Sequence, residues 1–78
     1  MARRIRTRLD SSSLALITYD PNDHTLDVVY RRTGYCYRYF DVPREIHRAL
    51  IETDSKGAFV NQVIKPNFEY ARAEIPLG

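Results

Sequence analysis

The most unusual stretch of the chain is residues 35–40, Tyr-Cys-Tyr-Arg-Tyr-Phe, in which every second residue is a tyrosine. Because side chains alternate across an extended strand, we expect Tyr35, Tyr37 and Tyr39 to form a row on one face, with Arg38 on the other. Exposed aromatic rings stack nucleic-acid bases, and each stacked base contributes roughly 1–3 kcal/mol. Tyrosines on small sheets are also often half-buried structural rings, so the sequence leaves both interpretations open.

A second group of residues belongs to the start of an expected helix. Ser55-Lys56-Gly57 opens it, and Asn61 and Lys65 follow at intervals of four, so that Gly57, Asn61 and Lys65 share one helical face. Free backbone N–H groups at a helix start attract anions, and a glycine lets a phosphate approach the backbone. The motif is too short for a nucleotide-binding P-loop, and an ordinary capped helix is the alternative. We predict that these four residues, Lys56, Gly57, Asn61 and Lys65, contact nucleic acid.

The third feature is a cluster of arginines at the N-terminus. Arg3, Arg4, Arg6 and Arg8 lie within the first eight residues, without an acidic residue among them. Their four positive charges exceed the net charge of the whole chain, which is +2, so the remaining residues are slightly acidic. A basic arm on such a body is typical of nucleic-acid binding, although a solubilising tail has the same composition. We therefore predict that residues 1–10 form a flexible basic arm.

The sequence offers little for catalysis. His24 and His47 have no neighbours that suggest a triad or a metal pair, and no carboxylates have the spacing of an acid–base pair. The single cysteine, Cys36, excludes an internal disulfide and a zinc site with several thiolates. We expect a protein that is not an enzyme, needs no metal or cofactor, does not enter membranes, and resides in the cytoplasm.

The elements that must position these residues follow from the hydrophobic pattern. Two β-prone runs, residues 14–19 and 25–30, are separated by turn-forming residues, and residues 35–42 form a third. After Pro43 the period changes to that of an amphipathic helix, and a shorter helix is expected to end at Pro66. The prediction is an α+β fold: a three-stranded antiparallel β-meander followed by two short helices packed on one face. It comprises one domain, residues 11–74, with a frayed C-terminus at 75–78.

Several of these motifs occur in the order found in one known family. The chain resembles the KTSC domain over roughly residues 11–70 through Tyr19-Asp20-Pro21, Tyr37-Arg38-Tyr39, Val42-Pro43 and Ser55-Lys56-Gly57-x-Phe59-x-Asn61-x-x-Ile64. This family is named for the C-terminus of some lysyl-tRNA synthetases and also includes small stand-alone bacterial or phage proteins. The resemblance implies a small domain of unknown function that is suspected of binding RNA.

Two functions fit the sequence. In the first, Tyr37 and Tyr39 stack bases of RNA or single-stranded DNA while Arg38, Lys56 and Lys65 meet phosphates, assisted by the basic arm. In the second, the chain is a protein-interaction or homodimerisation module that uses the third strand as an open edge or the tyrosine face as a patch.

Overall fold

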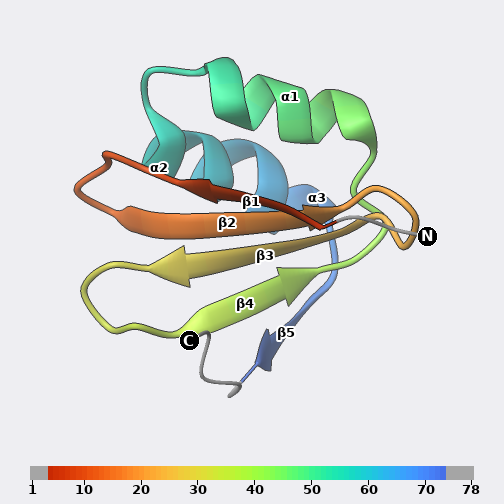
Figure 1. Cartoon of the computed structure of the whole chain (residues 1–78), viewed down its shortest axis with the longest axis horizontal. Helices are drawn as coiled ribbons and strands as arrows, with labels where there is room; N and C mark the ends of the chain where they lie inside the picture. The colour runs from red at the N-terminus through yellow and green to blue at the C-terminus, as the bar shows by residue number, and fades with distance from the viewer. Residues whose placement is uncertain (1–3, 74–78) are drawn as a thin grey trace.

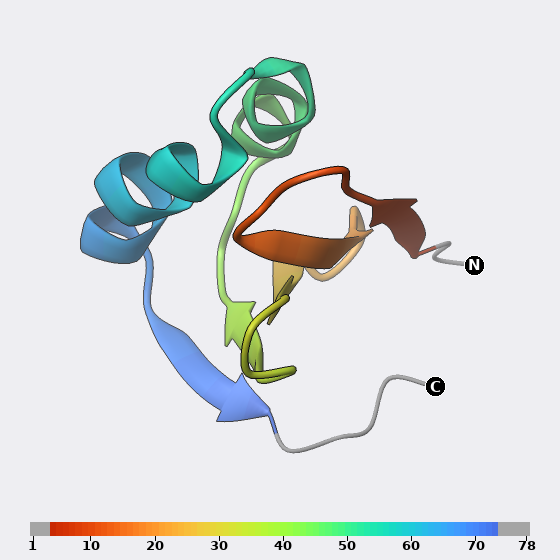
Figure 2. The same cartoon turned by 90° about the vertical axis from the view of Figure 1, so that its left-hand side faces the viewer.

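The fold is a five-stranded antiparallel sheet covered by helices on one face (Figures 1 and 2). It was obtained as a computed structural model, which describes residues 4–73. The strands follow each other in spatial order: β1 (Ile5–Arg8), β2 (Leu14–Asp20), β3 (Thr25–Tyr30), β4 (Cys36–Tyr39) and β5 (Tyr70–Ala73). Between β4 and β5 the chain forms α1 (Arg44–Glu52), α2 (Lys56–Phe59), the π-helix η1 (Val60–Ile64) and α3 (Lys65–Asn67).

The expected α+β class and the three-stranded meander are confirmed, but the sheet is larger than predicted. Two further strands flank the meander, β1 beside β2 and β5 beside β4. The prediction of a flexible arm is therefore wrong for residues 5–8, which pair with β2, and Leu9 lies in the core with 6% of its surface exposed. The predicted frayed end at 75–78 lies outside the described residues.

One face of the sheet supplies most of the hydrophobic core. Ile17 and Tyr19 of β2 are opposite Val28 and Leu26 of β3, and all four are buried beneath the helices. Leu50 of α1 and Val60 and Ile64 of η1 close this core from above. The alternating apolar side chains of the strands and the apolar side of the helices thus pack together in a single layer.

The turns form where turn residues were expected. The carboxylate of Asp20 accepts hydrogen bonds from the backbone N–H groups of Asn22 and Asp23, at 2.9 and 3.1 Å. In the β3–β4 turn, Gly34 adopts φ +74°, a conformation that residues with a Cβ rarely accept. These two turns determine which residues of β2, β3 and β4 face each other.

The second helical segment continues past the proline that was expected to end it. The elements α2, η1 and α3 run without interruption through residues 56–67, so Pro66 lies inside the helix. At the end of η1 the N–H of Lys65 reaches the carbonyl of Val60, five residues back. Such π-turns loosen the α-helical ladder next to Pro66, which has no N–H to donate.

Helices long and apolar enough to span a membrane are absent from residues 4–73.

Candidate functional site

The tyrosines of the third predicted strand share one face but differ strongly in exposure. In the register of β3 and β4, Tyr37 is opposite Val28 and Tyr39 is opposite Leu26, on the face that the helices cover. Tyr39 is completely buried, Tyr37 is half-buried, and Tyr35 is 45% exposed. The predicted stacking role is therefore wrong for Tyr39, because its ring is sealed in the core.

A groove opens where this burial ends. It has a volume of about 680 Å³, and we call it the tyrosine groove. Three elements meet there: the start of β2, the β3–β4 hairpin and the helical segment η1–α3; Figure 2 looks at this end of the molecule. The lining residues are Ser12, Ser13, Tyr30, Arg32, Thr33, Tyr35, Tyr37, Asn61 and Lys65. Two of them are cationic and none is acidic, so the groove suits an anionic ligand.

Its aromatic rings are held in place by one another and by cations. The rings of Tyr30 and Tyr37 meet edge to face, with centroids 5.4 Å apart. The Lys65 ammonium lies 5.7 Å from the centroid of Tyr30. The guanidinium of Arg72 lies over Tyr35, at 4.2 Å. The groove therefore combines π-faces with positive charge.

Of the predicted site residues, Tyr37, Asn61 and Lys65 come together in this groove. The predicted spacing of Asn61 and Lys65 places both on its helical wall. Tyr30 and Arg32 were not predicted as site residues. Tyr30 continues the apolar alternation of its strand and is half-buried against the core, as that pattern predicts, but it also ends β3 and lines the groove. Arg32 belongs to the adjoining turn, where sequence gives no indication of its neighbours.

Lys56 and Gly57 have structural contacts instead. The Lys56 ammonium donates hydrogen bonds to the carbonyls of Ile51 and Thr53 at the end of α1. Gly57 packs directly against Ser13: a Cβ on Gly57 would lie 2.7 Å from the Ser13 Oγ. The two residues line a polar hollow of about 570 Å³ that shares Ser12 and Ser13 with the tyrosine groove. Lys56 stabilises the helix end, and its predicted role as a phosphate contact is not supported by these bonds.

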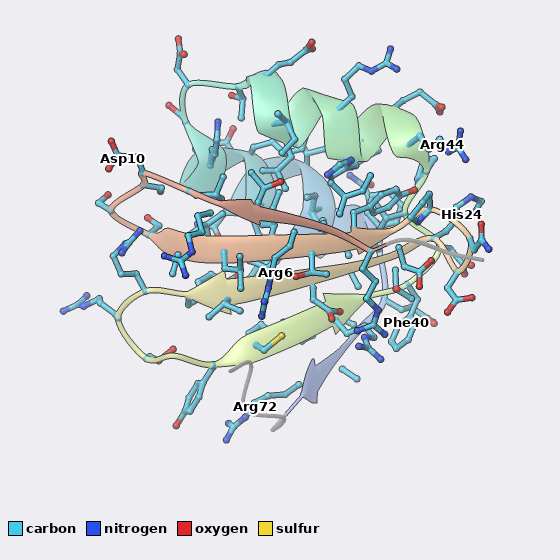
Figure 3. The ribbon with its side chains drawn as sticks, in the orientation of Figure 1. Arg6, Asp10, His24, Phe40, Arg44 and Arg72 are labelled. Carbon is cyan, nitrogen blue, oxygen red and sulfur yellow. The ribbon has the colours of Figure 1, made fainter. Side chains whose placement is uncertain are left out.

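The remaining predicted arginines lie on the helix-free face of the sheet. Arg38 is bonded to Asp27 through two hydrogen bonds of 2.7 and 3.0 Å. Arg6 and Arg8 are opposite Thr18 and Leu16 of β2, and Figure 3 shows Arg6 on this face.

Arg4 directly precedes β1, and its Nε lies 3.8 Å from the Oδ2 of Asp20. Arg3 is outside the described residues. Arg6 and Arg8 thus do not converge with the tyrosines, because alternation along β1 directs their side chains to the opposite side of the sheet.

The thiol and the imidazoles lie apart from the groove and from each other. Cys36 is buried opposite Val29, and burial raises the pKa of its thiol, which disfavours the reactive thiolate. His47, a residue of α1, stacks on the ring of Tyr19 with centroids 4.4 Å apart. His24 is exposed in the β2–β3 turn. Within residues 4–73, no three metal-ligating side chains of the His, Cys, Asp and Glu types are grouped.

The third predicted strand, β4, does not form the open edge of the sheet that an interaction module was expected to use. β4 is paired on both sides, with β3 and with β5, so its backbone is not free to receive another strand. The outer strands of the sheet are β1 and β5.

Comparison with known proteins gives consistent matches. The model of the KTSC domain family matches residues 10–68. A protein of Stutzerimonas stutzeri, described as uncharacterized, is 44% identical over 70 residues, covering 88% of this chain and 97% of the relative. A protein of Tsukamurella paurometabola is 35% identical over 60 residues, covering 77% and 88%. The crystal structure of a KTSC domain protein from Yersinia pestis is similar with a TM-score of 0.83 and 32% identity, covering 91% of this chain and 99% of that one.

Proposed function

This chain belongs to the KTSC domain family, and we propose that it is a non-catalytic module that binds single-stranded nucleic acid, RNA above all, in the tyrosine groove. The observation that carries the proposal is the composition of this groove: three tyrosine rings, two cations and an amide line it, and no carboxylate does. The attachment to lysyl-tRNA synthetases that the family resemblance implies supports RNA as the ligand.

The rings favour an unpaired strand. A base can stack on a protein ring only when its own face is released from a neighbouring base, which is the case in loops and single strands. Tyr35, with 45% of its surface exposed, is the most exposed ring of the groove, and the Arg72 guanidinium lies over it; Tyr37 is half-buried. One or two bases can therefore stack, which gives moderate affinity.

The cations favour a phosphate backbone alongside the bases. Both cations line the groove from different elements, Lys65 from the helical segment and Arg32 from the β3–β4 hairpin. With about two phosphate contacts, the logarithm of affinity should fall with the logarithm of salt concentration with a slope of about −1.4, since each contact on a single strand contributes about −0.7. Affinity is thus expected to be moderate and to fall about sevenfold between about 50 and about 200 mM salt.

Fluorescence anisotropy with a labelled single-stranded RNA of about ten nucleotides tests the proposal. The titration is run at salt concentrations from about 50 to about 200 mM. Tyr35→Ala should weaken binding roughly 5- to 150-fold, the loss of one stacked base. Lys65→Ala should also reduce the salt slope by about 0.7.

Two variants serve as controls for charge. Arg44→Ala removes a cation on α1 at the other end of the molecule (Figure 3) and should leave affinity nearly unchanged. Lys56→Met removes a cation that is bonded to carbonyls and should affect stability more than binding. Absence of binding at low salt, or an equal loss in Arg44→Ala and Lys65→Ala, would refute the proposal. A stable dimer that buries Tyr35 would also refute it, and this is the outcome expected of an interaction module. Light scattering detects the dimer.

A further inference from the structure

The side-chain amide of Asn61 is free to bind a ligand. It is exposed on η1 and lines the tyrosine groove, and among residues 4–73 its side chain has no hydrogen-bond partner. Asn67, on the same helical segment, is different: its amide donates to the carbonyl of Val63 at 2.7 Å. The Asn61 amide is therefore available to a ligand in the groove.

This amide lies in the same groove as the rings and the cation. Asn61 precedes Lys65 by four residues, so both project from one side of the helix, and the Lys65 ammonium lies over Tyr30. A base that enters beside these tyrosines brings its edge toward the helical wall, where Asn61 stands. From these positions we infer that Asn61 reads the base and makes the groove selective for adenine. The inference rests on the proposed function and specifies its ligand.

The chemistry of the bases supports adenine. A side-chain amide presents one donor and one acceptor side by side. Adenine presents the matching pair on both of its polar edges, N6 with N7 and N6 with N1, and asparagine commonly bonds adenine at N6 and N7. Cytosine and uracil offer such a pair on one edge only and have a smaller ring for stacking.

Guanine offers the amide a matching pair on one of these two edges only. On its Watson–Crick edge O6 lies beside N1–H, and the two N–H donors of that edge would be bonded best by a carboxylate, which no lining residue of the groove supplies. Its other edge carries two acceptors, which an amide can satisfy only singly.

A set of short homopolymers tests the inference. The affinities of labelled oligo(A), oligo(C) and oligo(U) RNA of equal length are compared at one low salt concentration. The wild-type protein should bind oligo(A) about 5- to 150-fold more tightly than the other two. Asn61→Ala should remove this preference, because it lowers the affinity for oligo(A) more than the affinity for oligo(U). Gln62→Ala removes an exposed amide from the same π-helix that does not line the groove, and should retain the preference.

The outcomes separate this inference from the proposed function. Equal affinity of the wild type for the three homopolymers, or a preference that survives in Asn61→Ala, overturns adenine reading by Asn61 and leaves single-strand binding in place. Lack of binding to every homopolymer overturns the proposed function itself.

Discussion

Asp27 and Arg38 face each other across β3 and β4, and two hydrogen bonds of 2.7 and 3.0 Å join the carboxylate to the guanidinium. The Asp27 side chain is only 5% exposed, and its hydrogen bond raises the pKa of Arg38 above the usual value. A slip of one residue between two strands would turn every side chain to the other face. This pair therefore supports the register that keeps Tyr37 and Tyr39 on the helix side.

Removal of one member of this pair should be costly. In Arg38→Met the carboxylate of Asp27 stays buried without a partner, and we expect the free energy of unfolding to fall by about 2–4 kcal/mol, less than for a fully buried pair because Arg38 is partly exposed. The double variant Asp27→Leu with Arg38→Met should recover most of this loss. Urea denaturation measures both, and a double variant no more stable than the single one would contradict this account.

Gly57 should resist substitution because of its contact with Ser13. Alanine usually stabilises a helix relative to glycine by about 1 kcal/mol. Here a Cβ would lie 2.7 Å from the Oγ and 2.8 Å from the Cβ of Ser13, so Gly57→Ala should instead destabilise by about 1–3 kcal/mol. Adding Ser13→Gly should relieve the clash and restore most of the stability. Thermal unfolding of the two variants is the measurement, and a single variant as stable as the wild type would show that the contact relaxes freely.

The hydroxyl of Tyr39 should be dispensable although its ring is not. This hydroxyl is buried without a hydrogen-bond partner, and burial raises the pKa of Tyr39, as does the neighbouring Tyr30. Tyr39→Phe should leave the free energy of unfolding unchanged or raise it by up to about 1 kcal/mol. Tyr39→Ala should lower it by about 3–5 kcal/mol, because it leaves a cavity. Chemical denaturation distinguishes the cases; a clear loss in Tyr39→Phe would mean that the hydroxyl bonds Tyr30.

His47 should make stability depend on pH. Burial lowers the pKa of His47 below its ordinary value of 6.5, and its Nε2 has no partner. The unfolded chain then takes up a proton at a higher pH than the folded protein, so the stabilisation by neutral His47 is fully present above about pH 6.5 and declines as the pH falls. His47→Phe keeps a ring against Tyr19 and should lose less stability between about pH 7 and about pH 5. Equal pH dependence of the two proteins in denaturation experiments would exclude this role.

The sequence predicts which tyrosines share a face but not how deeply each is buried. Alternation places Tyr35, Tyr37 and Tyr39 together because it depends only on local backbone geometry. Their burial depends on where the helices end over the sheet, which is a tertiary property. The helical period likewise predicts that Asn61 and Lys65 share a face, whereas Tyr30 joins them only through the packing of distant segments.

The sequence of the N-terminal strand contains a β-strand pattern that its high positive charge obscures. Ile5, Thr7 and Leu9 alternate with arginines, which is the pattern of a strand with one sheltered face. Four arginines in eight residues suggested a solvated arm instead. The strand forms because pairing with β2 satisfies its backbone, while Arg6 and Arg8 remain on the helix-free side.

The strands β1 and β5 lie outside residues 10–68, the span that the family model matches. A shortened chain cut to that span would lose both and leave β2 and β4 with rows of bare N–H and C=O groups. Such rows recruit strands from other molecules. Trimming this protein to its family boundaries would therefore expose the backbone edges of β2 and β4 that β1 and β5 cover, so both flanking strands belong in any minimal folding unit.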